Sequence, residues 1–95
     1  MDQVVQNRAV CITLTGNVDI TGHTDTYIMY KKPNGQEGMW DATSTNDTIC
    51  ELTYAVPNDV LDEVGIWGVK IKYVAGDGRK YEAPRPYRFR VIPSW

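Results

Sequence analysis

The residues from 65 to 73 show the clearest alternation of apolar and polar side chains in the chain. One side of an extended backbone there would carry Trp67, Val69, Ile71 and Tyr73. The opposite side would carry Gly68, Lys70 and Lys72. Successive side chains of a strand point to opposite faces, whereas a helical period of 3.6 would scatter the apolar set around a circumference. The pattern therefore predicts a strand at the centre of the core, with one buried side and one side facing solvent.

Six further segments have the composition of short strands. They span residues 9–14, 24–31, 37–43, 48–54, 80–83 and 87–92. In the last of them Tyr87, Phe89 and Val91 are expected to point inward and both arginines outward. Between the strands, residues 32–35 (Lys-Pro-Asn-Gly) and 75–78 (Ala-Gly-Asp-Gly) predict hairpin turns.

The remaining segments are predicted to be irregular. Residues 18–22 form a short turn or an edge segment, and residues 44–47 a loop. Residues 57–64 are expected to hold one helical turn, capped by Asn58 or Asp59. The polar residues 1–8 are expected to be loose.

About seven short strands with turn signals every 8–12 residues are typical of an antiparallel immunoglobulin-like β-sandwich. A small open barrel is the alternative architecture. The length of 95 residues predicts a single domain spanning 1–95 with one hydrophobic core. The Cys–Trp–Cys framework of true immunoglobulin domains is missing from the sequence.

The charge balance argues against two classes of partner. The formal net charge is −2 and the pI is about 5.2, so no overall basic field exists to attract nucleic acid or an anionic membrane. Residues 1–7 lack the regions of a signal peptide, which predicts synthesis in the cytoplasm. Cys11 lies in the outward phase of its segment and Cys50 in the inward phase of its own, so we expect two free thiols.

The residues that could support catalysis or metal binding do not converge in the sequence. His23 is the single histidine, lies in a glycine-flanked loop beside Thr24 and Asp25, and is expected to be exposed. One histidine and two out-of-phase cysteines do not supply a zinc site, and the acidic residues match no calcium loop. The sequence therefore predicts no catalytic residue, no cofactor site and no metal site, and the chain is not expected to be an enzyme.

The aromatic composition points instead to contact with a partner. Six Tyr and three Trp stand against one Phe, and rings that carry a polar group suit contact surfaces. Five large side chains exceed what so small a core is expected to hold, and they are predicted to form an interaction surface: Tyr27, Met29, Trp40, Tyr81 and Trp95.

The order of these signals from residue 19 onward resembles small immunoglobulin-like domains of bacteriophage virion proteins. The layout is similar to that of the N-terminal domain of the phage baseplate upper protein. The resemblance rests on four stretches, which are Asp-Ile-Thr-Gly at 19–22, Lys-Lys-Pro-Asn-Gly at 31–35, Val-Gly-Ile-Trp at 64–67 and Gly-Asp-Gly-Arg at 76–79. It covers about three quarters of the chain, and it implies a role in assembly or attachment without catalysis.

The sequence and the resemblance together predict a non-enzymatic structural or assembly module of a phage particle, in its baseplate, tail or head. The expected partners are other virion proteins or further copies of the chain in a homo-oligomer. The expected location is the virion, after synthesis in the host cytoplasm. A carbohydrate-binding module that uses exposed aromatic residues is the alternative.

Overall fold

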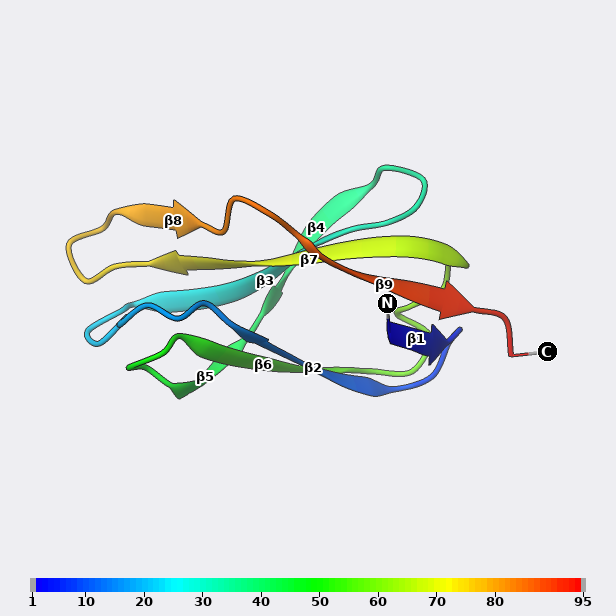
Figure 1. Cartoon of the computed structure of the whole chain (residues 1–95), viewed down its shortest axis with the longest axis horizontal. Helices are drawn as coiled ribbons and strands as arrows, with labels where there is room; N and C mark the ends of the chain where they lie inside the picture. Colours follow the sequence, from blue (N-terminus) through cyan, green and yellow to red (C-terminus); the bar gives the residue numbers. More distant parts are fainter. Residues whose placement is uncertain (1, 95) are drawn as a thin grey trace.

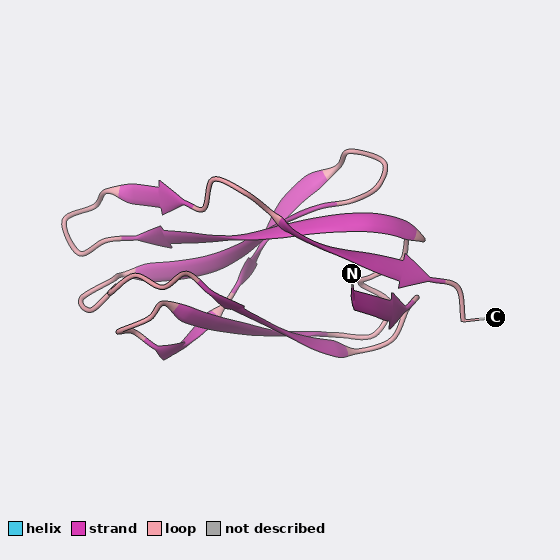
Figure 2. Ribbon diagram, viewed as in Figure 1, coloured by secondary structure: helices cyan, strands magenta, loops and turns pink. Residues whose placement is uncertain are grey.

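The computed structural model describes residues 2–94, which fold into nine strands arranged in two layers (Figure 1). All of the regular structure is β-strand (Figure 2). No helix long and apolar enough to cross a membrane occurs in residues 2–94. The strands are β1 (Asp2–Val5), β2 (Val10–Thr15), β3 (Asp25–Lys31), β4 (Glu37–Asp41), β5 (Thr43–Asn46), β6 (Glu51–Val56), β7 (Gly65–Val74), β8 (Lys80–Glu82) and β9 (Tyr87–Ile92).

The two layers are sheets of unequal size. The larger sheet has the order β1-β9-β7-β3-β4, with β8 also paired to β7, and the smaller sheet has the order β2-β6-β5. All strand pairs are antiparallel except β1 with β9, which are parallel. The predicted all-β, immunoglobulin-like sandwich is confirmed, with nine strands in residues 2–94 in place of about seven.

Strand β7 occupies the centre of the larger sheet, as its alternation predicts. Trp67, Val69 and Ile71 are 0%, 1% and 7% exposed, and they face the smaller sheet from the middle of the core. Burial of each aliphatic side chain contributes roughly 1.5–3 kcal/mol. The indole Nε1 of Trp67 donates to the carbonyl of Glu63 at 2.8 Å, so its polar group is satisfied inside the protein.

A strand forms at residues 2–5, which differs from the prediction that residues 1–8 are loose; residue 1 lies outside the described residues. Asp2–Val5 form β1 and pair with β9 in a parallel ladder, with Val4 opposite Val91. The amide of Gln6 continues this contact by donating to the carbonyl of Ile92 at 2.8 Å. The segment Asp-Gln-Val-Val is short and half polar, so its own strand signal is weak, and the edge of β9 supplies its hydrogen bonds.

The predicted strand 37–43 is divided in two, because the chain passes from the larger sheet to the smaller one at Ala42. The amide of Ala42 donates to the carbonyl of Thr26 at 3.1 Å, and the Thr26 hydroxyl donates to the carbonyl of Ala42 at 2.6 Å. Residues 44–46, predicted to be loop, therefore belong to β5 and pair with β6. Thr26 is the one buried polar side chain in residues 2–94, and these bonds explain its burial.

The segments on either side of β6 also differ from their predictions. Strand β6 begins at Glu51, since Cys50 has a φ of 53° and ends a turn that precedes it. Residues 57–64 contain no helical turn. Asp59 has a φ of 67°, which a right-handed helix does not allow, and the Asn58 side chain accepts from the amide of Ala9 at 3.0 Å. Leu61 is fully buried and anchors this segment to the core.

The two cysteines are free, as predicted. Cys11 is exposed on β2, and Cys50 is buried in the core.

Candidate binding groove between the two sheets

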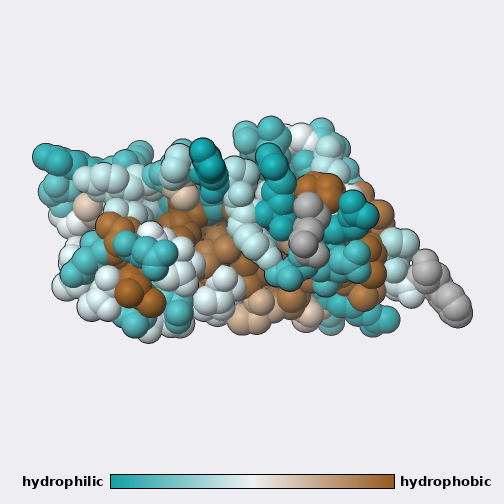
Figure 3. All heavy atoms as spheres, viewed as in Figure 1, coloured by the Kyte–Doolittle hydropathy of each residue, from teal (hydrophilic) through white to brown (hydrophobic). Residues whose placement is uncertain are grey.

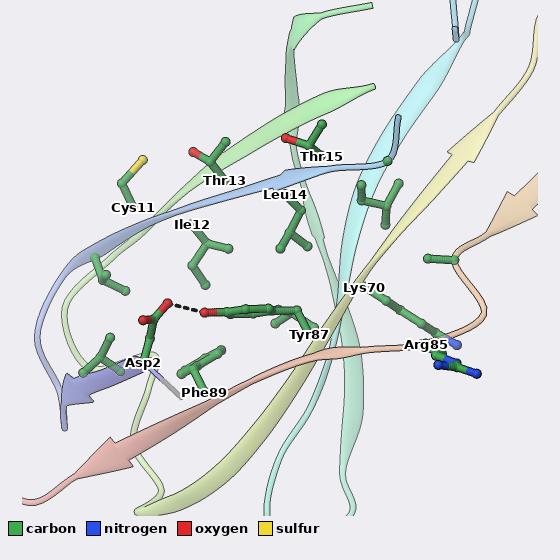
Figure 4. A pocket seen from close by; sticks show the side chains of 16 residues that line it. Asp2, Cys11, Ile12, Thr13, Leu14, Thr15, Lys70, Arg85, Tyr87 and Phe89 are labelled. Carbon is green, nitrogen blue, oxygen red and sulfur yellow. Dashed lines mark hydrogen bonds between the residues drawn. The ribbon is translucent and has the colours of Figure 1, made fainter. Parts of the chain in front are cut away.

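A groove runs between the two sheets along strand β2 (Figure 4). Its volume is about 620 Å³. Strands β1 and β9 of the larger sheet form one wall, and β2 of the smaller sheet forms the other. The larger sheet continues past β9 to β1, whereas the smaller sheet ends at β2. The groove therefore lies where a fourth strand of the smaller sheet would otherwise cover β1 and β9.

The walls of the groove are mainly apolar. Apolar side chains gather in the middle of the face shown in Figure 3, between the two layers. Ile12 and Leu14 of β2 point into the groove, while Cys11, Thr13 and Thr15 point away from it (Figure 4). The inward row of β2 is only half-buried, unlike the fully buried Leu52 that pairs with Leu14 from β6. The apolar groups that line the groove are those of Val4, Val10, Ile12, Leu14, Val69, Ile71, Ala83 and Phe89.

Strand β2 borders the groove with an open backbone edge. It pairs with β6 on one side, and no strand within residues 2–94 pairs with it on the other. Natural proteins usually protect such edges with charged residues, proline or a bulge. The sequence of residues 10–15, Val-Cys-Ile-Thr-Leu-Thr, contains none of the charged residues or prolines that would do so. The edge is therefore suited to pairing with another strand.

Tyr87 covers part of the groove from β9. Its position in the strand is in phase with Phe89 and Val91, which are buried as predicted, yet Tyr87 is 46% exposed. The prediction of a buried Tyr87 was wrong because β2 ends the smaller sheet before it reaches this ring. The phenol hydroxyl donates to the carboxylate of Asp2 on the neighbouring strand β1, along the same wall of the groove (Figure 4). This hydrogen bond raises the pKa of Tyr87, with a small contribution from burial.

Charged side chains of both signs border the groove at different levels. Asp2 lies level with Phe89 in the pairing of β1 with β9. Arg85 lies beyond Tyr87 at the end where β2 finishes, while the Lys70 side chain belongs to the outer row of β7 and points away from β2 (Figure 4). The Nζ of Lys70 is 3.8 Å from a carboxylate oxygen of Glu82, which is a loose contact. Within residues 2–94, no ion pair involves Arg85.

The side chains that line the groove are suited to binding a ligand and not to catalysing a reaction. Among its side chains, Asp2 is the single carboxylate, and no histidine is present. The one thiol, that of Cys11, points outward (Figure 4). Residues 2–94 contain no group of three or more His, Cys, Asp or Glu side chains placed to hold a metal ion. The groove offers apolar surface, unpaired backbone groups along β2, and the charged side chains of Asp2 and Arg85.

Of the five residues predicted to form an interaction surface, the four that the structure describes do not share one face. Trp40 is 8% exposed and lies in the core, stacked between Tyr30 at 4.5 Å and Tyr54 at 5.1 Å between ring centroids. Tyr27 and Met29 are half-buried on the outer side of β3, in phase with Lys31. Tyr81 is 41% exposed on β8 and stacks on Tyr73. Trp95 lies outside the described residues.

His23 is partly buried, in contrast to its predicted exposure. Its Nε2 lies 3.2 Å from Oδ1 of Asp47, and its Nδ1 is buried without a hydrogen-bond partner in the part of the chain that the structure describes. The hydroxyl of Ser44 donates to the same carboxylate oxygen. The carboxylate thus separates the hydroxyl from the imidazole, whereas nucleophilic catalysis needs these two groups in direct contact. These bonds link the loop that carries His23 to strand β5 and the turn that follows it.

Comparison with known proteins gives a likeness of fold. No family model and no curated protein matches the chain. Among solved structures, the chain is similar to the crystal structure of CopC from Methylosinus trichosporium OB3b. The TM-score is 0.57 with 25% identical residues, and the match covers 99% of this chain and 85% of that chain. This similarity agrees with the β-sandwich described above.

The prediction of a phage virion structural or assembly module was wrong. The structural similarity is to CopC, and none of the comparisons links the chain to a phage particle. The stretches that suggested a virion domain are turn sequences and one central strand, which β-sandwiches of many kinds need for the same physical reasons. The alternative of a carbohydrate-binding module used Trp40 or neighbouring tyrosines as stacking platforms, and Trp40 is buried.

Sequence reasoning missed the groove, although one signal for it was present. Residues 10–15 alternate between an apolar row and a neutral row without a protecting charge, which marks an edge that is open to pairing. Which strands lie at an edge depends on the sheet order, and a single sequence does not reveal that order.

Proposed function

We propose that this protein is a non-enzymatic binding module that holds an extended polypeptide segment in the groove beside β2. The segment would add to the smaller sheet as a fourth strand, using the open backbone edge of β2. The observation that carries the proposal is the apolar groove of about 620 Å³ at a strand edge that has no partner in residues 2–94.

Three features support an extended segment over a compact small molecule. The groove follows the length of β2 and is not a closed cavity, so its shape suits a chain. The inward row of Val10, Ile12 and Leu14 repeats every second residue, which matches alternate side chains of an added strand. The open edge of β2 presents a row of backbone amide donors and carbonyl acceptors. A second extended backbone can pair with the whole row at once.

The test uses a synthetic eight-residue peptide of alternating valine and threonine, and a control peptide of equal length with proline at two central positions. Binding is measured by NMR, from the backbone amide shifts of β2 and β9. The alternating peptide is expected to shift the β2 amides, while the proline peptide, which lacks two amide donors, is expected to leave them unchanged. Equal binding of both peptides, or of neither, would overturn the proposal.

Tyr87 provides the matched substitution. Tyr87→Ala is expected to weaken peptide binding by at least about fivefold, because it removes an aromatic side chain from the wall of the groove. Tyr81→Ala is the control, since Tyr81 is exposed to a similar degree, 41% against 46%, but lies outside the groove. If both variants lost the same amount of affinity, the peptide would bind at a site other than the groove.

A further inference from the structure

We propose that the outer face of the larger sheet carries a second binding site, which holds a small organic phosphate in a hollow above Gly68 of β7. The hollow has a volume of about 420 Å³, which lies within the range of small-molecule sites. Gly68 alternates with the buried Trp67 and Val69, so it faces away from the smaller sheet. The site is therefore separate from the groove and does not rest on the proposed function.

The strand register brings three cationic side chains around Gly68. Gly68 pairs with Lys31 of β3 on one side and with Arg88 of β9 on the other, so these two residues lie in one row of the sheet. Lys70 is the next residue on the same face of β7. Within residues 2–94, no ion pair involves Lys31 or Arg88, and Lys70 has only its 3.8 Å contact with Glu82.

Little negative charge lies close enough to neutralise these cations. Glu37 of β4, which pairs with Lys31, is the single carboxylate among the lining residues, and it forms no ion pair in the part of the chain that the structure describes. The fourth cation at the hollow, Lys32, is already neutralised, because its Nζ lies 3.0 Å from the carboxylate of Asp62. Like charges on neighbouring strands repel each other, so a bound anion would remove this repulsion.

Gly68 itself indicates that something approaches the sheet at this point. Glycine inside a strand weakens it, and it commonly marks a bulge or a place where a ligand or another backbone comes close. The ladders on both sides of Gly68 keep a regular register, and its φ is not positive. A Cβ atom added there would meet the Cβ of Pro86 at 3.4 Å, an ordinary contact distance. The fold does not require this glycine, whereas a ligand above the strand does.

Apolar side chains beside the cations favour an organic phosphate over the inorganic ion. Met29 and Ile66 contribute from the outer face of β3 and β7, and Pro33 and Pro86 contribute from the adjoining loops. Small-molecule sites typically combine such apolar walls with a few polar groups that fix the orientation of the ligand. The guanidinium of Arg88 can donate to two phosphate oxygens at once, and the two unpaired lysines supply point charges.

The test titrates the whole chain with phenyl phosphate and follows the backbone amide shifts by NMR at constant ionic strength. Phenyl phosphate is expected to shift the amides of Gly68 and of its neighbours in β3 and β9. It is expected to bind at least about fivefold more tightly than inorganic phosphate, because its ring covers apolar surface. Phenol, which has the ring without the phosphate, is expected to leave these amides unchanged.

Three substitutions locate the site. Arg88→Gln and Lys31→Gln are each expected to weaken binding of phenyl phosphate by about 3- to 10-fold, because each removes a charge-assisted hydrogen bond at an exposed position. Gly68→Val fills the hollow and is expected to abolish binding, with urea denaturation as the check on folding. Arg90→Gln is the matched control, since Arg90 lies on the same face of β9 but does not line the hollow. It is expected to change the affinity by less than about twofold.

The outcomes are distinct. Loss of binding at positions 31, 68 and 88, with Arg90→Gln unaffected, supports the site. An equal loss in Arg90→Gln would show a diffuse positive surface and overturn it. Shifts confined to the β2 amides would place phenyl phosphate in the groove and also overturn it. An oligothymidine of eight nucleotides that binds through Lys31 and Arg88, while phenyl phosphate does not bind, would assign this face to nucleic acid and reject the small molecule.

Discussion

At the scale of single residues, the two faces of β7 differ in a way that mutation can measure. Ile71 is 7% exposed, and the next residue, Lys72, lies half-exposed on the other face, opposite Tyr27 and Glu82. Ile71→Ala is expected to lower the free energy of unfolding by about 2–5 kcal/mol, since it removes buried methyl groups and leaves a cavity. Urea denaturation monitored by tryptophan fluorescence gives the value.

Lys72→Ala is the control for this prediction. Its side chain lies on the outer face of the larger sheet, so its removal is expected to change the free energy of unfolding by no more than about 0.5 kcal/mol. Equal losses at positions 71 and 72 would contradict the assignment of the inner and outer faces.

Single residues were predicted well where a strand is covered by a second sheet, and poorly where it is not. The alternation in β7 correctly placed Trp67 and Val69 inside, because β7 lies at the centre of its sheet. The same rule failed at Tyr87, which has the inward phase but faces the groove. The alternation rule also did not predict that Trp40 is buried, because its burial depends on stacking with Tyr30 and Tyr54 from other strands.

At the scale of elements, the sequence predicted strands and hairpin turns better than it predicted ends and crossings. The turns at 32–35 and 75–78 depend on local residue chemistry, which a sequence displays directly. The formation of β1 depends on an edge offered by β9, and the change of sheet at Ala42 depends on Thr26, far away in the sequence. These are tertiary effects, and no local pattern encodes them.

The dependence of β1 on one neighbour leads to a prediction about local stability. Strand β1 contains four residues and pairs with β9 alone, whereas β7 pairs with three strands. The amides of Gln6 and of β1 are therefore expected to exchange with solvent deuterium much faster than those of β7, through local opening that leaves the sandwich intact. Hydrogen exchange followed by NMR measures both. Equal protection would show that β1 opens only when the whole domain unfolds.

At the scale of the whole molecule, the groove results from two sheets of unequal size. Six strands in the larger sheet face three in the smaller one, and β1 and part of β9 extend beyond β2. Composition reveals how much apolar surface a chain can bury, but not how strands are shared between the sheets. The fold class could therefore be predicted from the sequence, whereas the candidate site could be found only once the order of the strands in each sheet was known.

The stability of the whole molecule is expected to fall at alkaline pH, because folding raises the pKa of two side chains that it buries. Burial raises the pKa of the Cys50 thiol, with a smaller contribution from the negative charge of Asp47, and burial also raises the pKa of Tyr73. Above the unfolded thiol pKa of about 8.5, the unfolded chain releases a proton that the folded chain retains, so rising pH favours unfolding. The same reasoning applies to Tyr73 above about pH 10.

Urea denaturation at a series of pH values, under reducing conditions, is expected to give a constant free energy of unfolding up to about pH 8 and a decline above about 8.5 that steepens beyond 10. Cys50→Ala removes the first titration, so its curve is expected to stay level until tyrosine ionisation begins. The comparison uses the change with pH and not the absolute stability, because the substitution also removes a fully buried sulfur atom. Parallel curves for the two proteins between pH 8 and 10 would show that the thiol ionises equally in both states, in contradiction to its position in the core.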